Sequence, residues 1–137
     1  MELIKPIQRN RSMTNLILTL AFLFPMQAQA NEEECLAKVI FAESRGESIE
    51  GAVAVGPATV NRAKRTGQAI CNLTGVARLT PPRNLMAHYR ALAKSVLAGK
   101  DSIVRNSDSW NTGTKPRNAG EVVRHIGGHV FYVMSEP

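Results

Sequence analysis

Glu43 is the residue whose surroundings in the sequence are best suited to chemistry. It follows Leu36, Val39 and Ile40 by seven, four and three residues, so a helix would place its carboxylate on their apolar face. Burial on that face disfavours the charged form, and so does the negative end of the helix dipole. A carboxyl group that keeps its proton near neutral pH can act as a general acid, for example toward the leaving oxygen of a glycosidic bond. The same Glu could instead be solvated or paired with Arg45, and periodicity alone leaves both interpretations open.

A second carboxylate would matter because both classical routes of glycoside hydrolysis use a pair. Glu47 and Glu50 follow closely in the sequence, and Asp108 lies in a later polar stretch. Glu50 would stand in the first turn of the next helix, where its charge suits the helix dipole. Glu47 therefore remains a candidate substrate contact, and Glu47 or Asp108 a candidate second carboxylate.

Trp110 is the only tryptophan, and it lies in a polar stretch outside any apolar periodicity. Its ring could stack on a sugar as a substrate-binding residue, or it could fill the core. Both interpretations stay open at the level of the sequence.

Two histidines flank the dipeptide Gly127-Gly128, which is typical of a two-residue hairpin turn. Such a turn places Ile126 opposite His129 and sends the side chains of His125 and His129 to opposite faces of the sheet. Because metal ligands must converge on one point, the sequence predicts no metal site, and we expect no cofactor. His129 could bond to the backbone or contact a substrate.

Three helices and a hairpin must position these residues. We expect a first helix that begins at Glu32, Glu33 and Glu34, whose charges suit its positive end, and that stops at Gly46. A second helix is capped by Ser48 and kinks or restarts at Gly56-Pro57. A third is capped by Asn84, carries an apolar stripe from Leu85 to Leu97 and stops at Gly99. With strands over Val122–Ile126 and His129–Met134, the class is α+β.

The N-terminus has the three parts of a secretory signal peptide. Lys5, Arg9 and Arg11 precede an apolar run over residues 16–24, and Ala28-Gln29-Ala30 supplies an A-x-A cleavage pattern. We therefore expect residues 1–30 to be a signal peptide and residues 31–137 to be one exported domain, periplasmic or extracellular. The alternative is an uncleaved membrane anchor, but the apolar run is short against the roughly 20 residues of a spanning helix.

The mature chain would carry 14 Lys and Arg against 10 Asp and Glu, a net charge of +4. That charge suits an anionic polymer, either nucleic acid or peptidoglycan, and export favours the cell wall. Its only cysteines, Cys35 and Cys71, are expected to pair in an oxidising compartment, although two free thiols remain the alternative. A bridge across that loop would stabilise the domain by roughly 4 kcal/mol.

Several segments together resemble the SleB-type cell wall hydrolases, the spore-cortex-lytic family. The resemblance rests on LAKVIFAESRGESIEGAVAV followed by NRAK and a Cys, on ALAKSVLAGK with the later Ser109-Trp110, and on the closing HIGGHVFYV. It implies a small lysozyme-like fold in which Glu43 is the catalytic acid and His129 and Tyr132 lie near the active-site cleft. Related sequences usually carry Gln-Phe-Ser after the matching Cys, whereas this chain reads CNLTGVARLTPPRN.

The resemblance implies cleavage of peptidoglycan glycan strands between N-acetylmuramic acid and N-acetylglucosamine, typically as a lytic transglycosylase. We expect a monomer that acts on peptidoglycan, does not bind nucleic acid and has no stable membrane span after signal cleavage. The alternatives are a water-using muramidase and a non-catalytic secreted module that only binds peptidoglycan.

Overall fold

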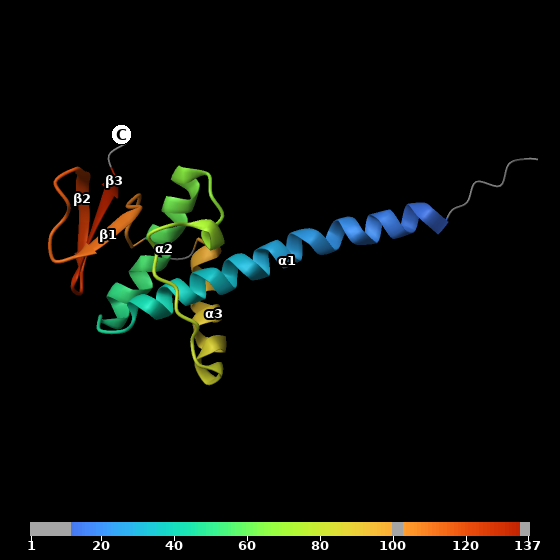
Figure 1. Cartoon of the computed structure of the whole chain (residues 1–137), viewed down its shortest axis with the longest axis horizontal. Helices are drawn as coiled ribbons and strands as arrows, with labels where there is room; N and C mark the ends of the chain where they lie inside the picture. Colours follow the sequence, from blue (N-terminus) through green and yellow to red (C-terminus); the bar gives the residue numbers. More distant parts are fainter. Residues whose placement is uncertain (1–11, 100–102, 135–137) are drawn as a thin grey trace, which may run out of the picture. The chain divides into compact units, whose positions relative to one another are not determined.

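The computed structural model describes residues 12–99 and 103–134, with side chains from residue 28 onward. The elements in chain order are α1 (Ser12–Glu43), α2 (Ile49–Thr66), the short 3₁₀ helix η1 (Ile70–Asn72), α3 (Arg83–Leu97), β1 (Ser109–Thr112), β2 (Ala119–Ile126) and β3 (His129–Met134) (Figure 1). Residues 31–137 form one compact unit and residues 1–30 another. Within the described ranges, no helix combines the length and the apolar character that crossing a membrane requires.

α1 begins well before the predicted start of the first helix. Glu32 and Glu34 therefore do not stand at a helix N-terminus, and their charges have other partners. Glu32 Oε2 accepts a hydrogen bond from the backbone N–H of Ile70 at 2.8 Å, which ties α1 to η1. Glu34 pairs with Lys38 and Arg90, and their hydrogen bonds hold the pKa of Glu34 below its usual value.

α2 is one continuous helix and does not restart at Gly56-Pro57. Ser48 caps it as predicted, since its Oγ accepts a hydrogen bond from the N–H of Gly51 at 3.1 Å. A Cβ at Gly56 would lie 3.1 Å from Val96 of α3 and 3.2 Å from Ile40 of α1. The glycine therefore lets three helices approach one another closely.

α3 forms where it was predicted, but its start differs. Pro82 is the N-cap residue, with no side-chain cap hydrogen bond, so the predicted cap at Asn84 is wrong. The inward face centres on Ala93 and Val96, while Leu85, predicted to lie on the apolar stripe, is 39% exposed. The stripe consequently begins one turn later than the sequence suggested.

The three strands form an antiparallel sheet in the order β1-β3-β2. The predicted hairpin is confirmed, with Ile126 opposite His129. β2 starts at Ala119 rather than Val122, and the pairing shifts register on either side of Val122. β1 was not predicted, because Ser-Trp-Asn-Thr shows no apolar alternation; it pairs along β3 at the edge of the sheet.

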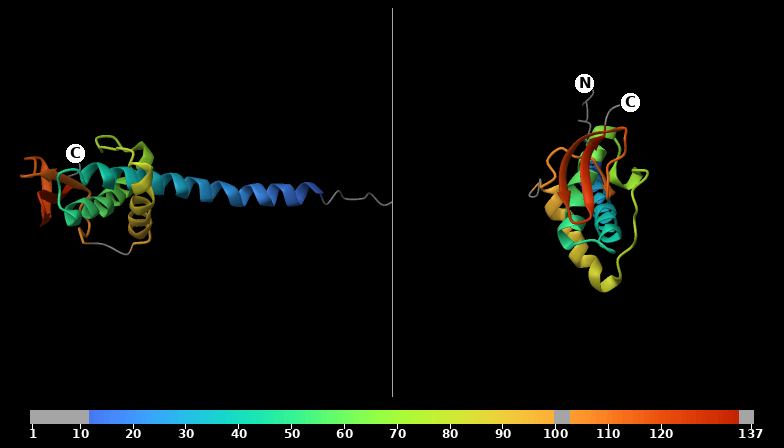
Figure 2. Two further views of the ribbon diagram at one scale, coloured as in Figure 1. Left: turned by 90° about the horizontal axis from the view of Figure 1, so that it is seen from below. Right: turned by 90° about the vertical axis from the view of Figure 1, so that its left-hand side faces the viewer.

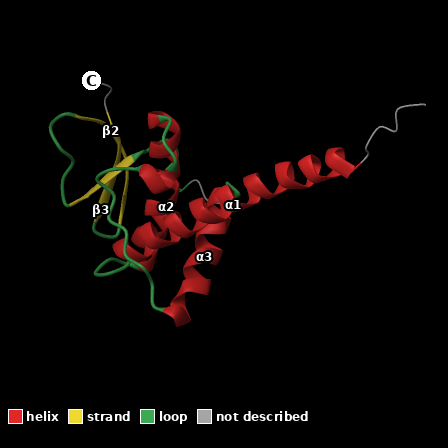
Figure 3. Ribbon diagram, turned by 45° about the vertical axis from the view of Figure 1, so that its right-hand side comes forward, coloured by secondary structure: helices red, strands yellow, loops and turns green. Residues whose placement is uncertain are grey.

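α2 contacts both the sheet and α3, and the views from several sides agree on this arrangement (Figures 2 and 3). One face of the sheet packs on the helices through Phe131 and Ile126, which meet Val39 of α1 and Val55 of α2. Cys35 and Cys71 form the predicted disulfide, with a Cα–Cα distance of 5.3 Å. The three helices and the antiparallel sheet confirm the α+β class.

Candidate functional site

Glu43 and His129 meet where the end of α1 faces the start of β3. Glu43 Oε2 lies 3.4 Å from His129 Nε2. The imidazole side chain is only 3% exposed, whereas the Glu43 side chain is 20% exposed. The carboxyl group can therefore contact the buried ring and still reach a ligand in solution. The titratable side chain beside it in the structure is His129, not the Arg45 considered from the sequence.

Glu47 approaches the other nitrogen of the same imidazole. Its Oε2 lies 3.8 Å from His129 Nδ1 and accepts a hydrogen bond from the backbone N–H of Gly128 at 3.0 Å. In the described part of the chain, His129 Nδ1 is the one buried side-chain nitrogen or oxygen without a hydrogen-bond partner. The ring thus has a carboxylate on each side.

Two glycines make this approach possible. A Cβ at Gly128 would lie 2.7 Å from Glu47 Oε1, and one at Gly127 would lie 2.5 Å from Ser48 Oγ. Gly127 also has a φ of +58°, which favours glycine. The absence of side chains at these two positions therefore lets the hairpin turn lie close to the loop between α1 and α2, and this fit brings Glu47 to His129.

Trp110 packs against the core, which is one of the two interpretations of the sequence, and stacking on a sugar stays a prediction. It lies on β1 opposite Phe131, on the same face of the sheet as His129, and it packs against the core while remaining partly exposed. The guanidinium carbon of Arg62 lies 4.7 Å from the centre of its ring. This distance is typical of a cation–π contact.

Tyr132 does not converge with His129. The two residues are three positions apart on one strand, so their side chains point to opposite faces. Tyr132 is buried with Val130 on the face away from the main core. Burial raises the pKa of Tyr132, as does the charge of Asp108, against the opposite effect of Arg62.

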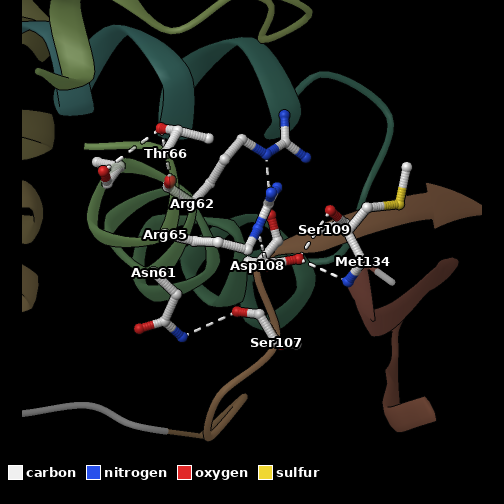
Figure 4. A network of polar contacts seen from close by, with 9 residues as sticks. Asn61, Arg62, Arg65, Thr66, Ser107, Asp108, Ser109 and Met134 are labelled. Atoms are coloured by element: carbon white, nitrogen blue, oxygen red, sulfur yellow. Dashed lines mark hydrogen bonds and ion pairs between the residues drawn. The ribbon is translucent and has the colours of Figure 1, made fainter. Parts of the chain in front are cut away.

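Asp108 is the centre of a polar network that joins α2 to the sheet (Figure 4). Its carboxylate accepts hydrogen bonds from Arg65 Nε, from Ser109 Oγ at 3.0 Å and from the backbone N–H of Met134 at 2.9 Å. Its backbone oxygen accepts one from Arg62 Nε at 2.9 Å. With both carboxylate oxygens engaged, Asp108 is placed to hold the strands in position rather than to serve as a second catalytic carboxylate.

Arg62 is the residue near the site that sequence reasoning did not single out. Its guanidinium group stacks on Trp110 and donates a hydrogen bond to the backbone oxygen of Asp108. The charge of Glu43 is among the effects that raise its pKa. Burial lowers the pKa of Arg62, while the charges of Asp108, Tyr132 and Glu43 raise it. A signal existed in the sequence, because Arg62 and Arg65 are three residues apart on the polar side of a predicted helix.

The fold and the site define a small α+β domain in which a partly exposed carboxyl group and a buried imidazole meet at the end of a helix. Among residues 12–99 and 103–134, no three His, Cys, Asp or Glu side chains are grouped to hold a metal ion. Comparison of the chain with protein-family models, with curated proteins and with solved structures finds no match.

Proposed function

We propose that this protein is an exported enzyme that cleaves peptidoglycan glycan strands as a lytic transglycosylase, with Glu43 as its acid and base and a lysozyme-like arrangement around it. The observation that carries the proposal is the position of Glu43. The Glu43 side chain at the end of α1 is one-fifth exposed, and its Oε2 atom lies 3.4 Å from Nε2 of the buried His129 imidazole. A positioned carboxyl group that can exchange a proton with a bound ligand is what general acid–base catalysis requires.

The imidazole supports this role through its two nitrogens. The Glu47 carboxylate beside Nδ1 favours the tautomer that carries the ring proton on that nitrogen. Nε2 is then an acceptor that faces Glu43 and can receive a hydrogen bond from the protonated acid. Glu47 thus acts on Glu43 through His129 and is a positioning residue.

The reaction needs no second carboxylate. Glu43 donates its proton to the oxygen that links C1 of N-acetylmuramic acid to the next sugar, and the C1–O bond breaks. The ionised Glu43 then takes the proton of the C6 hydroxyl group of the same sugar as that oxygen attacks C1. A 1,6-anhydro end forms, Glu43 regains its proton and no water is consumed.

Export is part of the proposal, and the Cys35–Cys71 disulfide supports it, because such bridges persist mainly in oxidising compartments. Residues 1–30 would be the signal peptide. Their apolar run lies in the segment whose side chains the structure does not describe, and residues 1–11 lie outside the described residues altogether. A monomer without cofactor, acting on the cell wall and not on nucleic acid, completes the proposal.

A water-using muramidase is the second candidate, because Glu47 is a carboxylate within 4 Å of the same imidazole. The two reactions give different products from purified sacculi. A transglycosylase releases muropeptides that end in 1,6-anhydro-N-acetylmuramic acid, each lighter by one water than the reducing product of a muramidase. Mass spectrometry that finds only reducing ends would refute the transglycosylase reaction, and the absence of released muropeptides would refute both enzymes in favour of a binding module.

A further inference from the structure

A cavity of about 310 Å³ lies between the C-terminal part of α2, the loop after η1 and the ends of β1 and β3. Its lining combines the apolar side chains of Leu73 and Met134 with polar and basic ones, among them Arg62, Arg65, Gln68, Thr74 and Tyr132. None of these side chains takes part in the acid–base chemistry proposed for Glu43. The cavity is therefore a separate feature whose chemistry needs its own explanation.

The two arginines give the cavity a net positive charge. Each uses its Nε atom to bond to Asp108, Arg62 to the backbone oxygen and Arg65 to the carboxylate (Figure 4). One carboxylate thus faces two guanidinium groups, whose terminal nitrogens are further donors. Burial lowers the pKa of Arg62, which shows that part of its hydration is lost. An anion in the cavity would offset that loss.

The donors suit a carboxylate. A guanidinium group is planar and binds both oxygens of a carboxylate through two parallel hydrogen bonds. Because burial raises the pKa of Tyr132, its hydroxyl group keeps its proton at neutral pH and can donate as well. The side chains of Gln68 and Thr74 add an amide and a hydroxyl group at an exposed rim.

Arg62 connects the cavity to the candidate site. It lines the cavity and also stacks on Trp110, which shares a face of the sheet with His129. Along β3 the backbone of Tyr132 lies about 10 Å from that of His129 at the usual rise of a strand, with the two side chains on opposite faces of the sheet. The link between the two places is Arg62, because it lines the cavity and the charge of Glu43 raises its pKa. In peptidoglycan the peptide branches from the lactyl group of N-acetylmuramic acid, the sugar cleaved at C1 in the proposed reaction. Its first free carboxylate lies about three extended residues away, roughly 10 Å.

We propose that this cavity binds a free carboxylate of the stem peptide carried by the N-acetylmuramic acid that the enzyme cleaves. This inference rests on the proposed function and adds to it a preference for peptide-bearing strands over bare glycan. A carboxylate and inorganic phosphate are both oxyanions that two arginines can bind. Phosphate is therefore included in the binding test as the competing ligand.

The first test measures binding without cleavage. NMR titration of the full chain uses N-acetyl-alanyl-glutamate, its uncharged diamide and inorganic phosphate. We expect saturable shifts at the cavity with the acid and binding at least about tenfold weaker with the diamide, since hydrogen bonds to the charged group are lost. Equal binding of acid and diamide, or tighter binding of phosphate than of the acid, would overturn the proposal.

Two variants locate the binding site. Gln68→Glu places a carboxylate at the exposed rim and should weaken binding of the acid about fivefold or more through like-charge repulsion. Asn84→Asp makes the same change of charge at an exposed position of α3 outside the cavity and should leave binding within about 1.5-fold. Arg65→Lys keeps a cation beside Asp108 but removes the planar guanidinium group that can donate two parallel hydrogen bonds to a carboxylate. It should therefore also weaken binding of the acid. Equal effects of Gln68→Glu and Asn84→Asp would place the carboxylate elsewhere.

A second test separates this inference from the proposed function. Cleavage is measured on intact sacculi and on glycan strands stripped of peptide by an amidase. We expect Gln68→Glu to slow cleavage of the intact sacculi more than cleavage of the stripped strands, and Asn84→Asp to change neither rate. If the wild-type protein and Gln68→Glu cleave intact sacculi at equal rates, and stripped strands at equal rates as well, the cavity proposal fails while the proposed function stands. If nothing is cleaved, the enzyme proposal fails, and the titration alone shows whether the cavity binds a carboxylate.

Discussion

Glu43→Gln is the substitution that tests the candidate site most directly. The amide has the shape of the carboxyl group but cannot give a proton to a leaving oxygen. Loss of a positioned general acid typically lowers a rate by about 10²- to 10⁴-fold. That range corresponds to about 2.7 to 5.5 kcal/mol in the activation free energy. The cleavage rate on sacculi should fall by this amount.

The free energy of unfolding should change far less. The Glu43 side chain is 20% exposed and its Oε2 lies 3.4 Å from His129 Nε2, a contact that the amide can keep by donating a hydrogen bond to Nε2 in the proposed tautomer. A partly exposed interaction of this kind contributes under about 1 kcal/mol. The effect on catalysis should therefore exceed the effect on stability several times over.

The assay compares three proteins by the clearing of a sacculus suspension, by thermal melting and by sedimentation with sacculi. Glu50→Gln is the matched control, because it makes the same chemical change at an exposed position in the first turn of α2. We expect this control to clear the suspension at nearly the wild-type rate. If folded Glu43→Gln clears it equally fast and releases the same products, Glu43 is not the acid and the reasoning from helix periodicity and from the His129 contact is wrong.

Three further predictions concern stability and ionisation. Reduction of the Cys35–Cys71 disulfide should lower the free energy of unfolding by roughly 4 kcal/mol, and an unchanged melting temperature after complete reduction would contradict this. Gly127→Ala should destabilise the protein by about 1 to 2 kcal/mol, because the backbone there has a φ of +58°, which is strained for a residue with a Cβ; chemical denaturation that gives the wild-type value would count against the described turn. Tyr132 should ionise above its ordinary pKa of 10.0 in an ultraviolet titration, and Tyr132→Phe should remove that late phase. Because its folded-state pKa is raised, Tyr132 contributes stability below pH 10 that is lost as the pH rises through that pKa.

Local patterns in the sequence were sufficient for most of the elements. The Ser48 cap, the body of α3 and the hairpin at Gly127-Gly128 all depend on residues within a few positions of one another, so their spacing predicts them. The cysteine pair was also correctly predicted, because only two cysteines were available to form a disulfide. The apolar face that carries Glu43 follows from helical spacing, and its residues Leu36, Val39 and Ile40 are fully buried.

The errors and omissions lie where distant segments decide the outcome. β1 is polar and forms a strand because β3 offers it hydrogen-bonding partners, which its own residues do not reveal. The contact of Glu43 and Glu47 with His129 depends on how the hairpin turn fits the loop after α1. Likewise, nothing in the sequence near Asp108 indicates its hydrogen-bond partners. They are Arg65 of α2 and the backbone N–H of Met134 in β3, which reach Asp108 because α2 packs against the sheet. Periodicity and turn residues determine structure within a few positions of the chain, whereas contacts between distant segments form only when the core packs. The sequence therefore indicated Glu43, Glu47 and His129 as candidates, but only the tertiary structure decided that they contact one another.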